Sequence, residues 1–133
     1  MKIGFKYFLF VLISVSLLTS CAPDDDLQID DRDKFIDSWT CSDSSNVFGS
    51  SAYTVTAERR GDIDSVRMKN FYNLGSSNFV YGLVSGSSIT IPSQISDGIT
   101  INGSGIFSNN SFNINYTAKD GSVTDVGKAV YTK

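Results

Sequence analysis

The 133-residue chain contains no histidine. Without an imidazole it cannot form a serine–histidine–aspartate triad, a histidine-liganded zinc site or an imidazole proton relay. Its two cysteines, Cys21 and Cys41, are too few for a zinc site built from four thiolates. The Gly-Ser-Gly run at Gly103–Gly105 matches neither the Gly-x-Ser-x-Gly nucleophile motif nor a phosphate-binding loop. We therefore expect a protein that is not an enzyme and carries no cofactor.

Basic residues are scarce too: 11 Lys and Arg stand against 14 Asp and Glu, a net charge of −3 at pH 7. Lys2 and Lys6 precede an N-terminal apolar run, and the rest of the chain has nine basic and fourteen acidic residues, a net charge of −5. Nucleic acid binding needs clustered Lys and Arg that displace counterions. Arg59 and Arg60 form only a two-residue cationic tip, which we expect to be solvated. The composition argues against nucleic acid and against peripheral binding to anionic headgroups.

The sequence has no apolar run long enough to span a bilayer as a permanent helix, which takes ~20 residues. The run from Phe8 to Leu18 follows two lysines and is typical of an export signal. It ends in Leu18-Thr19-Ser20-Cys21, which resembles the lipobox of bacterial lipoproteins. The resemblance implies that residues 1–20 are a cleaved signal peptide and that Cys21 carries long acyl chains such as palmitate. The alternative is a soluble secreted protein that is cut nearby.

An acidic segment, residues 21–34, follows the cysteine and contains six aspartates after Pro23 against Arg32 and Lys34. Repulsion between like charges and the lack of apolar side chains predict a flexible, solvated tether. Acids directly after a lipidated cysteine resemble the surface-export signal of Bacteroidota-type lipoproteins, which implies the outer membrane and exposure at the cell surface; a simple spacer is the alternative. The segment lacks the glycine and terminal glutamate of a calcium loop, so we expect no metal. Cys41 is then the remaining thiol, and we expect it to be buried.

The remaining residues, 35–133, have the sequence pattern of an all-β domain. β-Branched and aromatic runs alternate with Gly, Ser, Asn and Asp clusters, and no run has the length and period of a core helix. After one helical turn at Asp30–Ile36, we expect strands at Ser38–Ser42, Ser51–Arg59, Asp62–Phe71, Asn78–Ser85, Ser88–Pro92, Gly98–Phe107, Ser111–Lys119 and Asp125–Lys133. Pro92 should end its strand or lie on an edge. Short links make antiparallel hairpins, and eight in succession can close into an up-and-down β-barrel with a bend at Gly103 and Gly105. A two-sheet sandwich is the alternative.

The segment Asp33–Cys41 (DKFIDSWTC) is similar to the entry of lipocalin-like barrels, where a helical turn leads into Gly-x-Trp on the first strand. Asp37 stands in place of that glycine. The resemblance implies that Trp39 plugs one end of the barrel and that a basic side chain, Arg67 or Lys128, covers it. The wider pattern resembles small lipocalin-like or calycin-like outer-membrane lipoproteins of Bacteroidota type.

Aromatic residues at alternating strand positions are the candidate ligand-lining set: Tyr53, Phe79, Tyr81, Phe112 and Tyr116. Eight strands leave a lumen just wide enough for side chains or for one small ligand. We expect these rings to fill the lumen, with an aromatic-lined pocket as the alternative. Asp62 and Asp64 share a strand face beside a turn, where solvated acids are more typical than a catalytic pair. Asp64-Ser65-Val66 resembles a Bacteroidota-type O-glycosylation acceptor, with Ser65 as the candidate residue.

These observations predict a lipid-anchored cell-envelope barrel that acts as a non-enzymatic binding module for a small apolar ligand or for a protein partner. One alternative is an inhibitor of a protease or lysozyme, for which the segment Ser44–Ser51 (SSNVFGSS) would be the protruding loop. The other alternative is a structural accessory lipoprotein of an envelope complex. A pocket above ~300 Å³ with an open mouth would favour a small ligand.

Overall fold

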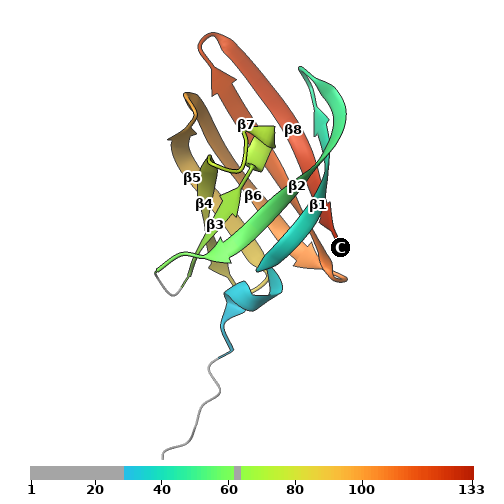
Figure 1. Cartoon of the computed structure of the whole chain (residues 1–133), viewed down its shortest axis with the longest axis vertical. Coiled ribbons are helices and arrows are strands. Elements are labelled where there is room, and N and C mark those ends of the chain that lie inside the picture. The colour runs from blue at the N-terminus through green and yellow to red at the C-terminus, as the bar shows by residue number, and fades with distance from the viewer. Residues whose placement is uncertain (1–28, 62–63) are drawn as a thin grey trace, which may run out of the picture.

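The structure, a computed structural model, describes residues 29–61 and 64–133. Every strand pairs antiparallel with the next, and β1 pairs with β8, so the sheet closes into an eight-stranded barrel (Figure 1). The strands are β1 (Asp37–Ser45), β2 (Gly49–Arg59), β3 (Ser65–Lys69), β4 (Phe79–Ser85), β5 (Ser88–Ser96), β6 (Ile99–Ser108), β7 (Ser111–Asp120) and β8 (Val123–Thr132). The predicted up-and-down barrel is confirmed, and the sandwich alternative is wrong. The signal peptide, Cys21 and Asp62 lie outside the described residues.

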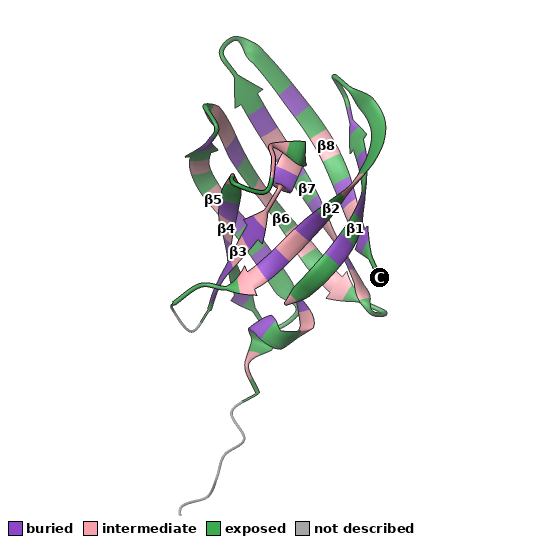
Figure 2. Cartoon of the chain, viewed as in Figure 1, coloured by how far each residue is buried: buried purple, intermediate pink, exposed green. Residues whose placement is uncertain are grey.

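Buried and exposed residues alternate along the strands because successive side chains of a strand point to opposite faces (Figure 2). On β1 the buried positions are Trp39, Cys41, Asp43 and Ser45. Cys41 is fully buried, as expected, and burial raises the pKa of its thiol to about 11, so it stays protonated. In the described part of the chain, no helix is long and apolar enough to cross a membrane.

A 3-10 turn, η1 (Asp31–Lys34), lies under one end of the barrel (Figure 1). Arg32 is only 8% exposed, and its guanidinium donates hydrogen bonds to the carbonyl oxygens of Arg60 (2.9 Å) and Ser65 (3.2 Å). Asp30 caps the turn and forms an ion pair with Arg32 at 2.7 Å. The helical turn was predicted, but the expected tether boundary is wrong, because these contacts place the start of the folded body at Asp30 rather than at residue 35.

Packed aromatic rings fill this end of the barrel, which we call the closed end. Trp39 is 1% exposed, and its indole Nε1 donates to the carbonyl oxygen of Phe35 at 2.8 Å. Its ring meets the rings of Phe112 and Phe107 edge-on, with centroids 4.9 and 6.4 Å apart. Phe112 in turn stacks on Tyr131 with centroids 4.3 Å apart. The structure thus places Trp39 where the lipocalin resemblance implied a plug.

The basic side chain that covers Trp39 is Lys133, whose Nζ lies 4.8 Å from the ring centroid and pairs with Asp37 at 2.6 Å. The expectation of Arg67 or Lys128 is wrong. Arg67 lies over the ring of Phe79 on the outer surface, and Lys128 is exposed on β8. Asp37, which stands where lipocalin-like barrels have glycine, holds Lys133 in place, and this contact lowers the pKa of the Asp37 carboxyl.

Strand β5 passes through Pro92 rather than ending there, and because β5 has no backbone pairing with β4 beyond Thr90, Pro92 lies on a locally unpaired edge, the second of the two predicted outcomes. Its register to β6 shifts between Ile91 and Gln94, which marks a β-bulge. On the other side, β4 and β5 pair only along Leu83–Ser85. Beyond that stretch the Gln94 side chain replaces the ladder, accepting from the backbone N–H of Tyr81 (2.9 Å) and donating to its carbonyl oxygen (2.8 Å). A side-chain amide thus supplies the donor that proline lacks.

Gly103 and Gly105 lie on the inward-facing positions of β6, where the backbone of β7 approaches closely. A Cβ at position 103 would lie 2.7 Å from the carbonyl oxygen of Asn115, and one at position 105 would collide with that of Asn113. The close approach of β7 therefore requires glycine at both positions, and the bend expected there stays a prediction. β3 is shorter than predicted, and the chain after it, including η2 (Phe71–Asn73), folds over the other end of the barrel (Figure 1).

Candidate functional site: the barrel mouth

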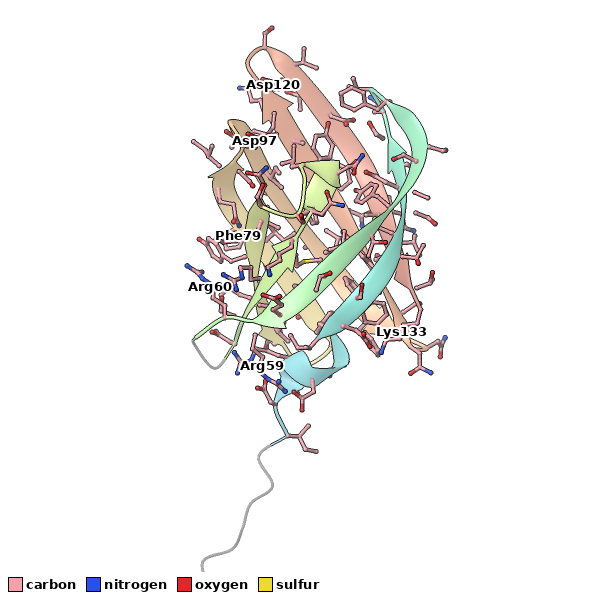
Figure 3. The ribbon with its side chains drawn as sticks, viewed as in Figure 1. Arg59, Arg60, Phe79, Asp97, Asp120 and Lys133 are labelled. Carbon is pink, nitrogen blue, oxygen red and sulfur yellow. The ribbon has the colours of Figure 1, made fainter. Side chains whose placement is uncertain are left out.

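A cavity of about 600 Å³ opens at the end of the barrel opposite η1. It lies among the β1–β2 turn, the segment around η2 and the β7–β8 turn, near Asp120 at the top of Figure 3. The residues that line it are Asp43, Ser45, Val47, Phe48, Ser51, Tyr53, Tyr72, Asn73, Leu74, Ile99, Ala118, Asp120, Val123 and Asp125. The expectation of a filled lumen therefore holds at the closed end, while the mouth is hollow.

Asp43 points into the cavity from β1 and is 5% exposed. Its two carboxylate oxygens accept hydrogen bonds from the phenols of Tyr53 (2.8 Å) and Tyr116 (2.7 Å). Burial raises the pKa of both phenols well above the usual value, and the hydrogen bonds to Asp43 raise it further. Both tyrosines thus remain neutral donors to the carboxylate at any physiological pH.

Asp125 points inward from β8 and is 2% exposed. It accepts hydrogen bonds from the hydroxyls of Ser45 (2.5 Å) and Tyr72 (2.6 Å) and from the backbone N–H of Val47 (3.1 Å). Burial alone would raise the pKa of its carboxyl, but the donated hydrogen bonds outweigh burial and leave the pKa below the usual value. Asp125 is therefore ionised at neutral pH, and it ties the β1–β2 turn to β8 and to η2.

Tyr72 reaches Asp125 from a strained backbone position, with φ 56° and ψ 24°. Positive φ is uncommon for a bulky residue and clusters at functional sites. Asn70 supports the loop, since its side-chain oxygen accepts from the N–H of Gly75 (2.8 Å) and its amide donates to the carbonyl oxygen of Thr54 (2.8 Å). The folded structure therefore holds the Tyr72 ring in the mouth against its local preference.

Aromatic rings continue from the mouth into the core. Phe48, on the rim and 74% exposed, lies edge-on to Tyr72 with centroids 6.2 Å apart. Tyr72 meets Tyr116 at 5.4 Å, and Tyr116 meets Phe71 at 5.9 Å. Edge-to-face contacts of this kind hold rings at fixed angles. The mouth is thus a preformed hollow with aromatic walls and two buried carboxylates.

The predicted ligand-lining set divides into two groups. Tyr53 lines the cavity. Tyr116 lies inside the barrel beneath the cavity, and Phe112 lies inside the barrel at the closed end. Phe79 and Tyr81 point outward, which corrects their expected inward orientation; Phe79 is 42% exposed and stands off the outer side of the ribbon in Figure 3. The inward positions of β4 are instead small residues such as Val80 and Gly82.

The other candidate residues lie away from the mouth. Ser65 is 1% exposed on β3, and its hydroxyl has no hydrogen-bond partner. A glycan on that oxygen would not fit the folded barrel, so the structure contradicts Ser65 as a glycosylation site on the folded protein. Asp64 is exposed next to it, at the closed end. Among residues 29–61 and 64–133, no three acidic, cysteine or histidine side chains converge to hold a metal ion.

Sequence reasoning missed Asp43, Phe48, Tyr72 and Asp125. The inward orientation of Asp43 and Asp125 could have been predicted from strand periodicity. Asp43 is in phase with the inward Trp39 on β1, and Asp125 is in phase with the inward Tyr131 on β8. Phe48 and Tyr72 lie in connections, where no periodicity indicates the direction of a side chain. No protein-family model, curated protein or solved structure significantly matches this chain.

Proposed function

We propose that this chain is a lipid-anchored, non-enzymatic binding module of the outer membrane that takes a small, largely apolar ligand into the barrel mouth. The cavity of about 600 Å³ carries the proposal. Pockets for small molecules usually measure ~300–1,000 Å³ and combine apolar walls with a few polar groups. The apolar rim residues Val47, Phe48 and Val123 are 46, 74 and 52% exposed, so they offer contact area at the entrance.

A protease- or lysozyme-inhibitor role finds less support. The segment considered for it, Ser44–Ser51, continues β1 and β2 and leaves only a turn at residues 46–48. The backbone N–H groups of Val47 and Phe48 donate to Ser45, and Val47 also donates to Asp125. These hydrogen bonds hold the turn against the wall of the cavity. The turn therefore suits the wall of a pocket better than it suits a loop that inserts into the cleft of a partner.

The direction of the barrel fits an anchor at Cys21. Ile29, the first described residue, enters at the closed end, and the mouth lies at the opposite end (Figure 1). A chain held by acyl groups on Cys21 would therefore present the mouth away from the bilayer. If the lipobox-like sequence directs lipidation of Cys21, this arrangement lets the mouth take up ligands from the solvent on the side of the barrel that faces away from the membrane.

The test is binding of a neutral apolar dye, Nile red, with two matched variants. Phe48→Ala removes a ring from the mouth, whereas Phe79→Ala removes a ring of lower exposure, 42% against 74%, from the outer wall. Loss of part of a phenylalanine contact, about 1 kcal/mol, should weaken Nile red binding by about fivefold in Phe48→Ala and leave it unchanged in Phe79→Ala. Native mass spectrometry of the protein taken from its own membrane should show a retained small molecule. Equal effects of both variants, or no binding by the parent chain, would refute the proposal.

A further inference from the structure

We infer that the mouth cavity selects ligands with a positive charge, namely organic ammonium ions with an apolar body. The ammonium head would lie near Asp43 and Asp125 against the aromatic wall. This inference deepens the proposed function and rests on it, because it names the chemical class of the ligand that the same cavity takes.

The first argument is uncompensated buried charge. Asp43 and Asp125 are 5 and 2% exposed. Buried carboxylates in proteins are usually paired with a basic group. Their hydrogen-bond partners here are hydroxyls and backbone N–H groups, all of them neutral. No Lys or Arg is among the residues that line the cavity in the described part of the chain, and Asp120 adds a third acid at its rim. A bound cation would supply the missing partner.

The basic side chains of the body lie elsewhere. Arg32 and Arg59 are paired with Asp30 at the closed end. Lys133 lies over Trp39 there, at the lower right of Figure 3. Arg67 pairs with Glu58 on the outer wall. Lys119 precedes the rim residue Asp120 on β7 but is exposed and does not line the cavity, so acids are the charged side chains of the cavity wall.

The second argument is that the Asp43 carboxylate can accept further hydrogen bonds. Each oxygen of Asp43 accepts one phenol bond, from Tyr53 or Tyr116. A carboxylate oxygen has two lone pairs, so each retains a free acceptor position. An ammonium N–H donor fits these positions, whereas a ligand carboxylate would add negative charge where two acids are already buried. The site therefore both attracts cations and repels anions.

The third argument is the wall around the acids. Tyr53 and Tyr72 bring aromatic rings to the cavity beside the carboxylates, and Phe48 adds a ring at the rim. Aromatic faces attract ammonium groups, and more strongly where water is excluded. Leu74 and Ile99 offer aliphatic surface for a hydrocarbon body. This combination suits an organic cation better than a metal ion, which prefers a full set of oxygen ligands.

The experiment compares three probes with the same carbon skeleton: 4-phenylbutylamine, 4-phenylbutanol and 4-phenylbutyrate. Each is titrated by calorimetry into the full acylated chain in nanodiscs, with empty nanodiscs as the blank. We expect the amine to bind at least about tenfold more tightly than the alcohol, and the butyrate to bind most weakly. This comparison uses the unmodified chain, so it does not depend on the folding of a variant.

Two variants then locate the selectivity. Asp43→Asn and Asp125→Asn keep the shape of the side chain and should reduce the preference for amine over alcohol to about threefold or less, with alcohol binding retained. The matched control is Asp97→Asn, because Asp97 is an exposed acid on the β5–β6 turn (Figure 3) at φ 48°, a conformation that asparagine tolerates. It should leave the preference unchanged.

The outcomes separate the two proposals. If amine and alcohol bind equally, or if Asp97→Asn removes the preference as strongly as the mouth variants do, the inference of cation selectivity is overturned while ligand binding stands. If none of the three probes binds, the proposed function and the inference fall together.

Discussion

At the scale of single residues, the mouth depends on a glycine that faces a tyrosine. Gly127 pairs with Tyr116 across the β7–β8 ladder and lies on the inward side of β8. A Cβ there would collide with the phenol oxygen of Tyr116 and lie 2.9 Å from the carbonyl oxygen of Ser44. Since that phenol donates to Asp43, the absence of a side chain at position 127 makes room for the hydrogen bond.

Gly127→Ala should therefore displace Tyr116 from Asp43. Overpacking a well-packed interior usually costs about 1–3 kcal/mol of unfolding free energy, and we expect a loss in that range. Urea denaturation measures it. Gly61→Ala is the control, because a Cβ at Gly61 meets no atom of the described residues within 4 Å and Gly61 is not among the glycines with positive φ. It should change stability by less than about 0.5 kcal/mol. Equal losses in the two variants would contradict the packing role assigned to Gly127.

At the scale of elements, the join between β4 and β5 depends on one side chain. Gln94 is the bridge to Tyr81 beyond the point where backbone pairing of these strands stops. A part-buried N–H and C=O left without partners destabilise a fold by about 1–3 kcal/mol. Gln94→Leu keeps the approximate size but removes both hydrogen bonds to Tyr81, together with the one donated to the carbonyl oxygen of Pro92 (3.0 Å), and should lower the free energy of unfolding by about 1–3 kcal/mol.

Two further variants sharpen the test of this bridge. Gln94→Glu can still accept from the Tyr81 N–H but cannot donate to its carbonyl oxygen, so it should fall between the parent and Gln94→Leu. Ser93→Ala, at the exposed neighbouring position, should have little effect. Urea denaturation of the four chains gives the order. A Gln94→Leu variant as stable as Ser93→Ala would show that the bridge contributes nothing.

The strand pattern made the barrel predictable, since period-two burial and turn residues act locally. The phase of β4 was misjudged because Phe79, Tyr81 and Leu83 are apolar yet face outward, where Arg67 lies over the ring of Phe79 and Arg60 over that of Tyr81. Hydrophobicity alone cannot distinguish an interior position from an outer one covered by arginine stems. The continuation past Pro92 was also unpredictable, because it relies on a contact between two strands.

The candidate site was harder to predict from the sequence than the fold was. A cavity remains where the side chains of a closed sheet do not fill the volume that the sheet encloses. The pattern of residues along one strand does not show how much of that volume stays empty. Asp43 and Asp125 were in phase with core residues, and a buried polar position is informative. The strained position of Tyr72, in contrast, follows from tertiary contacts alone.

At the scale of the whole molecule, the barrel has two unlike ends. Aromatic packing around Trp39 and the contacts of η1 close one end, and the chain enters there from Ile29. The acidic cavity opens at the other. If Cys21 carries acyl chains, the anchored segment joins the barrel at the end opposite the binding site, and the loss of the anchor should leave the site intact.

Cys21→Ser should therefore move the protein from the membrane fraction to the soluble fraction, because each acyl CH₂ removed from the bilayer weakens anchoring by about 0.8 kcal/mol. Its affinity for Nile red should stay within about twofold of the parent, since the residues that line the mouth are unchanged. Cys41→Ser is the matched control: it removes the buried thiol of the core and should leave the protein in the membrane fraction. Ultracentrifugation and detergent phase partition measure both. A Cys21→Ser protein that sediments with membranes as the parent does would refute the lipid anchor, whatever the mouth binds.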